Sequence, residues 1–246
     1  MRILYFDCFS GISGDMTLAS LVDAGADRDY IEQGLKKLGV EGYSLLWKHV
    51  MKSGISALKA DVVLHEKQRF KVLQSHRGYS DIVKLIENAD FNERATELAL
   101  NIFKKIGIAE AKIHAIPLDS VHFHEVGAID SIVDIVGVAL AIDNLQPDRI
   151  LASPIPLGSG TVRIDHGIYP VPAPATLEMM RGLPIAPSTH AFELTTPTGA
   201  GIVAAVVDEF SSGLPPMVVQ SIGYGAGTRD LPAQPNVLRT VIGLVD

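Results

Sequence analysis

Apolar positions recur along the chain with two periods, one typical of strands and one typical of helices. Short apolar runs predict strands at 2–6, 149–152, 218–222 and 237–244. Apolar residues three and four positions apart predict helices at 17–24, 28–38, 82–89, 91–113, 128–140 and 197–207. Because helices and strands are interspersed, we expect a mixed α/β fold with a central mixed sheet and flanking helices.

Two further strand-like runs, 43–50 and 57–65, are joined around Ser53 and Gly54 and predict a β-hairpin. A hairpin interrupts strict alternation of strand and helix, so the sheet is expected to be mixed. The 246 residues suit one large domain or two small ones. We expect a single region, 1–246, built as one domain or as two packed lobes of about 1–115 and 116–246.

Polar side chains with metal-binding chemistry are concentrated between residues 121 and 134. His122 and His124 alternate with apolar residues, which in an extended segment places both imidazoles on one face. Asp130 and Asp134 are one helical turn apart and share a side of the following apolar helix. With Glu125 between the two pairs, imidazole and carboxylate groups from a strand end and a helix start can meet at one point.

Such a mixed donor set suits a borderline divalent cation such as nickel, zinc, manganese or iron. Two structural alternatives remain open. Asp130 and Asp134 can simply complement the dipole at a helix start, and one histidine can be a hydrogen-bonded core residue.

A loop that follows the first strand is a candidate anion or cation site. It runs from Asp7 through Ser10, Ser13 and Gly14 to Asp15, in the strand, loop, helix order that holds anions in many proteins. Asp7 and Asp15 are also candidates for binding a metal or a phosphate-bound cation. The alternative is an ordinary turn with Asp15 near the helix N-cap.

A second helix start has the same potential. Thr196 is a candidate N-cap and is followed by a proline at the first helical position. The hydroxyls of Thr195, Thr196 and Thr198, together with free N–H groups near Gly199, suit a phosphate or a carboxylate. A well-capped structural helix is the alternative. Two further segments are expected to lack strands. The segment 154–161 is expected to be a loop that could expose backbone N–H groups, and 223–230, rich in glycine, is expected to be a turn between the last two strands.

The composition argues against some classes of binding partner and indicates a cellular compartment. The formal net charge is −7, which argues against an electrostatic grip on nucleic acid or on an anionic membrane. The single cysteine, Cys8, excludes an internal disulfide and fits a reducing compartment. The apolar runs are shorter than the ~20 residues that span a bilayer, and the start lacks a signal peptide. We therefore expect a cytoplasmic protein.

Taken together, the motifs resemble those of the LarC family, and they occur in family order along the whole chain. They are DCFSGISGDM at 7–16, VHFHEVG at 121–127, DSIVD at 130–134, PVPAPAT at 170–176, ELTTPTGA at 193–200 and NVLR at 236–239. The resemblance implies a nickel chelatase that inserts nickel into pyridinium-3,5-bisthiocarboxylic acid mononucleotide and so makes the nickel-pincer cofactor. The family reaction uses CTP with a divalent cation.

On this resemblance we assign residues to two roles. His122, His124, Glu125, Asp130 and Asp134 are expected to receive nickel. The residues expected to hold the mononucleotide are Asp7, Ser10, Ser13, Gly14, Asp15, His166, Thr195, Thr196, Thr198 and Gly199. Two other classes remain open: a nickel carrier without catalysis, and a metal-dependent phosphoester hydrolase.

The chain departs from the family pattern in two places. The histidine-rich run that many relatives carry after the hairpin is reduced here to 65–69, which argues against high-capacity nickel storage. Relatives also continue well past the NVLR motif, so this chain is expected to correspond to the N-terminal portion. We expect CTP use to need the C-terminal portion, in the same chain or as a partner, and we expect a homo-oligomer.

Overall fold

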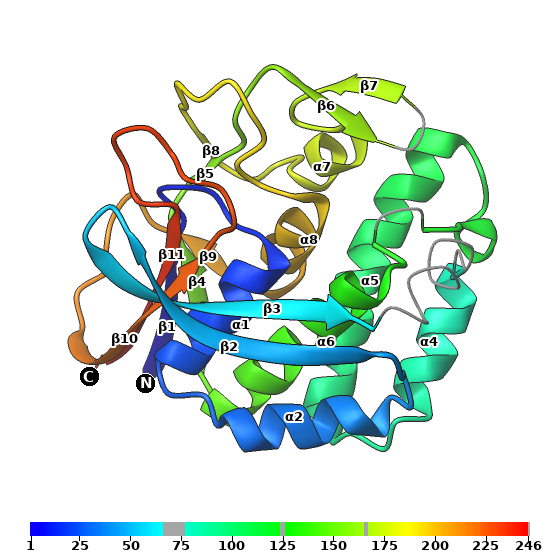
Figure 1. The fold of residues 1–246 in the computed structure, drawn as a ribbon, viewed down its shortest axis with the longest axis horizontal. Coiled ribbons are helices and arrows are strands. Elements are labelled where there is room, and N and C mark those ends of the chain that lie inside the picture. Colours follow the sequence, from blue (N-terminus) through cyan, green and yellow to red (C-terminus); the bar gives the residue numbers. More distant parts are fainter. Residues whose placement is uncertain (66–76, 124–125, 165–166, 246) are drawn as a thin grey trace.

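The computed structural model describes residues 1–65, 77–123, 126–164 and 167–245. Within these residues, a large mixed sheet is covered by helices on one side (Figure 1). The predicted mixed α/β fold with a central sheet is confirmed. In order across the sheet, the strands are β2 (Tyr43–Lys52), β3 (Ile55–Leu64), β10 (Val218–Ala226), β11 (Val237–Leu244), β1 (Arg2–Asp7), β4 (Arg149–Ala152) and β9 (Glu209–Phe210).

The first strand lies near the middle of this sheet. It pairs antiparallel with β11 and parallel with β4, so strands from both halves of the chain share one hydrogen-bonded sheet. The register sets Asp7 opposite Arg239, and the two side chains form an ion pair. At the other end of β1, the Met1 ammonium donates to the Val245 carbonyl at 2.8 Å, which holds the two ends of the chain side by side (Figure 1).

The predicted hairpin is present as β2 and β3, which pair antiparallel from Tyr43 opposite Leu64 to Lys52 opposite Ile55. It crosses the front of the molecule in the view of Figure 1. Only one residue pair, Gly225 with Leu58, joins β3 to β10 in register. The hairpin is therefore attached to the main sheet chiefly at one end of β3.

The helices are layered on one face of the sheet. They are α1 (Gly14–Asp23), α2 (Arg28–Lys37), α4 (Tyr79–Glu87), α5 (Glu93–His114), α6 (Ile129–Leu145), α7 (Pro174–Met179) and α8 (Pro197–Val206), with a 3₁₀ turn at Leu118–Ser120. Helix α1 packs on β10, β3 and β11 and, on its other side, against α6. None of the helices in the described ranges is long and apolar enough to cross a bilayer.

The central position of α6 explains its nearly continuous apolar sequence. It packs against α1, α2 and α5, and its buried residues include Ile132, Val136 and Leu140. Side chains of β1 contribute to this main core from one face of the sheet, through Leu4 and Phe6. The alternate residues of β1 belong to a smaller cluster on the opposite face, as the period of two requires.

Two sequence-based expectations are corrected. The segment 223–230 is not wholly a turn, because β10 continues to Ala226. Gly223 and Gly225 lie in that strand because α1 crosses it closely: a Cβ at position 225 would lie 1.9 Å from the Met16 carbonyl oxygen. The segment 154–161, expected to be a loop, contains the short strand β5 (Ile155–Pro156), which pairs with β8 (Ile185–Ala186). The hairpin of β6 (Thr161–Ile164) and β7 (Gly167–Pro170) was not predicted.

We predict that Gly225→Ala lowers the free energy of unfolding by about 2 kcal/mol or more, because the added methyl group meets helix backbone that cannot move aside. Gly213→Ala is the control, since a Cβ there meets nothing within 4 Å. Its effect should stay within about 0.5 kcal/mol. Urea unfolding of the two variants measures the difference, and equal midpoints would contradict the close packing of α1 on β10.

Candidate functional site

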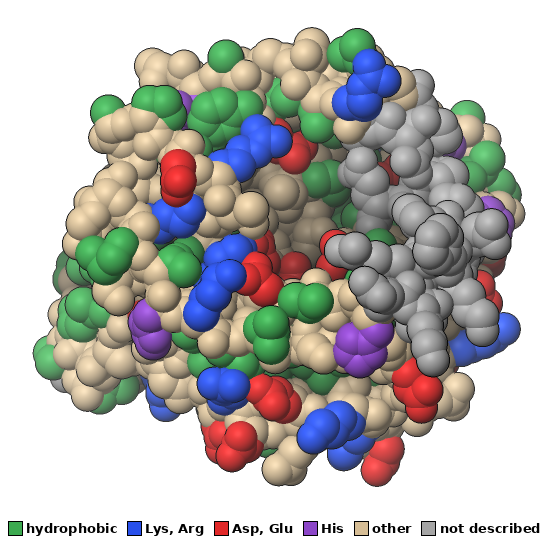
Figure 2. Space-filling model, viewed as in Figure 1, with side chains coloured by type: hydrophobic (Ala, Val, Ile, Leu, Met, Phe, Trp, Pro, Cys, Tyr) green, Lys and Arg blue, Asp and Glu red, His purple; other side chains and the backbone are tan. Residues whose placement is uncertain are grey.

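A pocket of about 320 Å³ opens beside the N-termini of α1 and α8. It is lined by residues from the start of α1, from β3, from α6 and from the start of α8, which are far apart in the sequence. These include Ser13, Gly14, Asp15, Lys59, Asp61, Val126, Asp130, Ser131, Asp134, Glu193, Thr196, Thr198 and Thr228. Figure 2 shows a hollow on this face with acidic side chains inside it and basic side chains at its rim.

The two helix starts meet because their loops pack backbone against backbone. The Thr196 N–H donates to the Ile12 carbonyl at 3.1 Å. A Cβ at position 199 would lie 2.1 Å from that same carbonyl oxygen. A Cβ at Gly11, where φ is +88°, would likewise lie 2.1 Å from the Leu194 carbonyl oxygen. Only glycine permits this approach. The result is that two helix N-termini, each a partial positive charge, line one pocket.

The first turn of α1 carries both donor and acceptor groups. Ser13 is the N-cap residue, but its hydroxyl bonds to the Asp15 carboxylate and not to a helix N–H. The first-turn N–H groups are therefore not capped by that side chain. Gly14 is required here because a Cβ would meet Asp134 of α6 at 2.7 Å and Thr198 of α8 at 2.9 Å.

At the start of α8, the predicted cap is present. The Thr196 hydroxyl accepts from the Gly199 N–H at 3.1 Å, and Pro197 follows at the first helical position, as the sequence indicates. Thr198 is buried and lines the pocket. Thr195 points elsewhere: its hydroxyl donates to the Pro156 carbonyl at 2.8 Å, so it fixes the loop and not a ligand.

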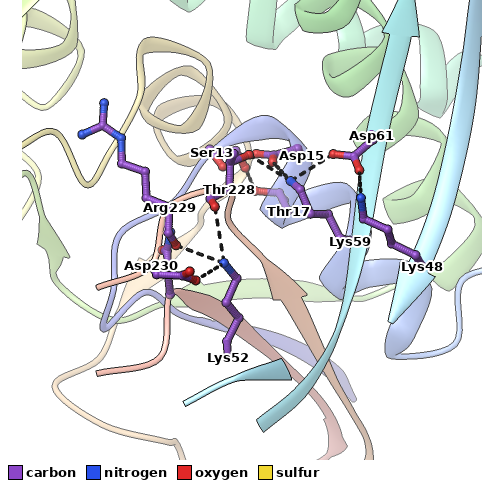
Figure 3. A network of polar contacts seen from close by, with 11 residues as sticks. Ser13, Asp15, Thr17, Lys48, Lys52, Lys59, Asp61, Thr228, Arg229 and Asp230 are labelled. Carbon is purple, nitrogen blue, oxygen red and sulfur yellow. Dashed lines mark hydrogen bonds and ion pairs between the residues drawn. The ribbon is translucent and has the colours of Figure 1, made fainter. Parts of the chain in front are cut away.

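Lys59 of β3 brings the only ammonium group among the described residues that line this pocket. Its Nζ lies 3.1 Å from Asp15 and 3.2 Å from Asp61, and it donates to the Thr228 hydroxyl at 3.0 Å (Figure 3). Burial alone lowers the pKa of this ammonium, but the two carboxylates outweigh burial and hold the pKa above its ordinary value. Lys59 therefore stays charged in the pocket.

Asp134 has the least compensated carboxylate of the site. Its Oδ1 is buried and has no hydrogen-bond partner in the described part of the chain. Burial first, and then the neighbouring charges of Asp15 and Asp130, raise its pKa well above the ordinary value. An unpartnered carboxylate oxygen of this kind is suited to a cation or to a proton.

The remaining predicted residues fall into two groups. Asp7, paired with Arg239, and Ser10, which donates to the Pro235 carbonyl at 2.7 Å, do not line the pocket. His122 is exposed and forms a backbone bridge with Gly78. His124, Glu125 and His166 lie outside the described residues. Within the described ranges, no three His, Cys, Asp or Glu side chains are grouped closely enough to hold a metal ion.

The whole of this site lies within one family pattern. The model of the family described as "Nickel insertion protein" matches residues 4–245. The chain belongs to this family. The match confirms the resemblance to the LarC family that the motifs indicate.

Two relatives in the family carry the name pyridinium-3,5-bisthiocarboxylic acid mononucleotide nickel insertion protein. The protein from Geobacillus kaustophilus is 55% identical over 99% of this chain and 60% of its own length. The protein from Clostridium kluyveri is 46% identical over 99% of this chain and 62% of its own length. The chain thus spans about three fifths of the length of the curated relatives that it matches. No solved structure matches it.

Several pocket residues of this family member were not found from the sequence. Lys59 and Asp61 are two apart in β3, so they share a face and both reach the pocket. Two charged residues within an otherwise apolar strand were the available signal. Thr228 belongs to the segment expected to be a turn, and its position over the pocket depends on the pairing of β10 with β11.

We predict that Asp134→Asn raises the free energy of unfolding at pH 7 by about 1 kcal/mol or more. In the native state Asp134 keeps its proton to a higher pH than the ordinary pKa of 3.8, whereas in the unfolded chain it ionises near that value. The stability of the unmodified protein therefore falls as the pH rises from about 4 through the folded-state pKa. Removing the carboxylate removes this loss, and the gain should vanish below about pH 4. Urea titrations across this range measure it.

The control is Glu41→Gln, which changes an exposed carboxylate and should alter stability by less than about 0.5 kcal/mol at any pH. An Asp134→Asn protein that is less stable than the unmodified protein at pH 7 would contradict the account of an uncompensated buried charge.

Proposed function

We propose that this chain inserts nickel into pyridinium-3,5-bisthiocarboxylic acid mononucleotide, with nickel and the mononucleotide as its substrates. One observation carries the proposal beyond family membership: a single pocket combines two helix N-termini and a buried ammonium with five carboxylates. An anion and a divalent cation can therefore be bound within one volume. Metal transfer to an anionic ligand requires that combination.

The anionic ligand is assigned to the side of the pocket formed by α1 and α8. The first residues of both helices line the pocket, Ser13 and Gly14 at the start of α1 and Pro197 and Thr198 at the start of α8. Helix N-termini suit a phosphate or a thiocarboxylate. Lys59 adds a full positive charge, which the sequence motifs at the two helix starts lack. Gly199 supports this side by permitting the close packing of the two loops, and Gly14 does so by permitting the close approach of α1 to Thr198 and Asp134.

Nickel is assigned to the part of the pocket that α6 lines. Asp130 and Asp134 of α6 line the pocket, and His122 lies on the segment that leads into α6. Our proposal keeps His124 and Glu125 as further ligands. Mixed imidazole and carboxylate ligation releases a metal more readily than a thiolate cage does, which suits delivery to a sulfur-containing acceptor.

We assign the use of CTP to the C-terminal portion. The relatives are longer than this chain, which matches about three fifths of their length. The pocket supplies one lysine, and that lysine is already paired with Asp15 and Asp61. A triphosphate needs several cationic partners or a bound divalent cation. We propose that the chain works in the cytoplasm, as a homo-oligomer, together with that C-terminal portion in cis or in trans.

We predict that His124→Ala weakens nickel binding by about tenfold or more, because loss of one imidazole from a mixed site removes a direct ligand. His65→Ala is the matched control, since His65 is exposed and its Nε2 lies 2.8 Å from the Ser44 hydroxyl, on the hairpin. Nickel titration calorimetry gives both affinities. Equal affinities for the two variants would refute the ligand assignment.

We also predict that residues 1–246 bind nickel and the mononucleotide unaided but complete CTP-dependent insertion only when the C-terminal portion is supplied. The measurements are nickel insertion and CTP hydrolysis with and without that portion in trans. Full CTP turnover by the isolated chain would place the nucleotide triphosphate site in this half. Nickel release without modification of the mononucleotide would indicate a carrier.

A further inference from the structure

A second pocket, of about 190 Å³, adjoins the one described above. The two share a wall formed by Ser13, Asp15, Glu193, Thr196 and Thr228. The second pocket adds its own lining, which includes Phe192, Gly227, Arg229, Leu231 and Asn236. The N-terminus of α1 thus lies between two compartments, and one extended ligand can occupy both.

The two compartments differ in charge. Among the described residues, five carboxylates and one ammonium line the larger pocket. The smaller pocket has two of those carboxylates, Asp15 and Glu193, and gains the guanidinium of Arg229. Asp15 is already paired with Lys59. A phosphate group therefore meets less repulsion in the smaller pocket, while a divalent cation is favoured in the larger one.

Arg229 is a candidate for binding an anion in the smaller pocket. Within the described part of the chain it forms no ion pair, and its guanidinium lies over the Phe192 ring, 5.7 Å from the centroid. A guanidinium that lies over an aromatic ring uses one of its flat faces for that contact. The N–H groups at its edge can still donate to the oxygen atoms of an anion. Figure 3 shows the Arg229 side chain extending away from the ammonium groups of Lys52 and Lys59.

The backbone that carries Arg229 is held in place from two sides. The Arg229 carbonyl accepts from the buried Lys52 ammonium at 3.1 Å and from the Asn236 amide at 2.9 Å. Lys52 also pairs with Asp230 at 2.6 Å, and the Gly227 N–H donates to the Asn236 carbonyl at 2.9 Å. A preorganised loop loses little conformational entropy when its side chain binds a ligand.

We propose that the smaller pocket binds the phosphate of the mononucleotide substrate through Arg229 and the N-terminus of α1, so that the pyridinium ring extends into the acidic pocket where nickel is held. The inference rests on the proposed function and adds the orientation of the substrate. Arg229 acts in binding the phosphate and takes no part in the bond-making step.

The test compares two probes, nicotinic acid mononucleotide and its riboside, which differ only in the phosphate. Calorimetry gives the affinity of each for the unmodified protein, for Arg229→Gln and for Arg229→Lys. We expect the unmodified protein to prefer the mononucleotide by about 10- to 100-fold. Arg229→Gln should bring this ratio close to one, and Arg229→Lys should retain part of it because charge remains but the planar fork is lost.

The matched control is Arg28→Gln. Arg28 also stacks on an aromatic ring, that of Trp47 at 5.4 Å, but it lies on α2 and lines neither pocket. This variant should keep the full preference for the mononucleotide. Near-ultraviolet circular dichroism and thermal melting confirm that the variants remain folded.

Three results would overturn the inference. An unmodified protein that does not distinguish the two probes has no phosphate site, and an unchanged ratio in Arg229→Gln places that site elsewhere. Cytidine monophosphate is titrated as a further probe, and if Arg229→Gln weakens its binding but not that of nicotinic acid mononucleotide, Arg229 serves a different nucleotide. Nickel insertion by the unmodified protein, measured in parallel with the C-terminal portion supplied, separates the two proposals. Insertion that persists alongside any of these results leaves the proposed function standing, whereas its absence refutes both.

Discussion

The pocket depends on the backbone contact between the loop before α1 and the loop before α8. These loops meet so closely that the Ile12 carbonyl accepts from Thr196 and lies within 2.1 Å of any Cβ at position 199. Larger residues at Gly11 or Gly199 would push the loops apart. The two helix starts would then no longer face the same volume, and the pocket would lose the combined field of both N-termini.

Charge balance is the second constraint on this site. Five carboxylates in one small pocket repel one another, and Lys59 offsets part of that repulsion through its pairs with Asp15 and Asp61. Asp134 remains uncompensated, which is seen in its unpartnered Oδ1 and its raised pKa. Such an arrangement costs stability in the absence of a cation. Natural proteins accept such costs at sites where a ligand supplies the missing partner.

The different charge of the two pockets, five carboxylates with Lys59 in the larger and two carboxylates with Arg229 in the smaller, follows from the sheet and the helices packed on it. Strand β3 places Lys59 and Asp61 in the larger pocket. The connection from β10 to β11 places Arg229 in the smaller pocket and Thr228 in the wall that the two share. Helix α6 completes the acidic side with Asp130 and Asp134. A ligand that is anionic at one end and binds a metal at the other fits this distribution of charge.

The sequence by itself determined the fold class, the hairpin and the capped helix start at Thr196, because these depend on local periodicity and capping chemistry. It placed the first helix at 17–24, whereas α1 begins at Gly14 with Ser13 as the N-cap residue. It also determined family membership, since six motifs in order are more specific than any single one. Only the tertiary structure decided which polar residues share a pocket. Thr195 and Thr196 are neighbours, yet one bonds to the Pro156 carbonyl while the other caps α8. Lys59 is far from both in sequence and was missed, because its position depends on strand pairing and helix packing between distant segments.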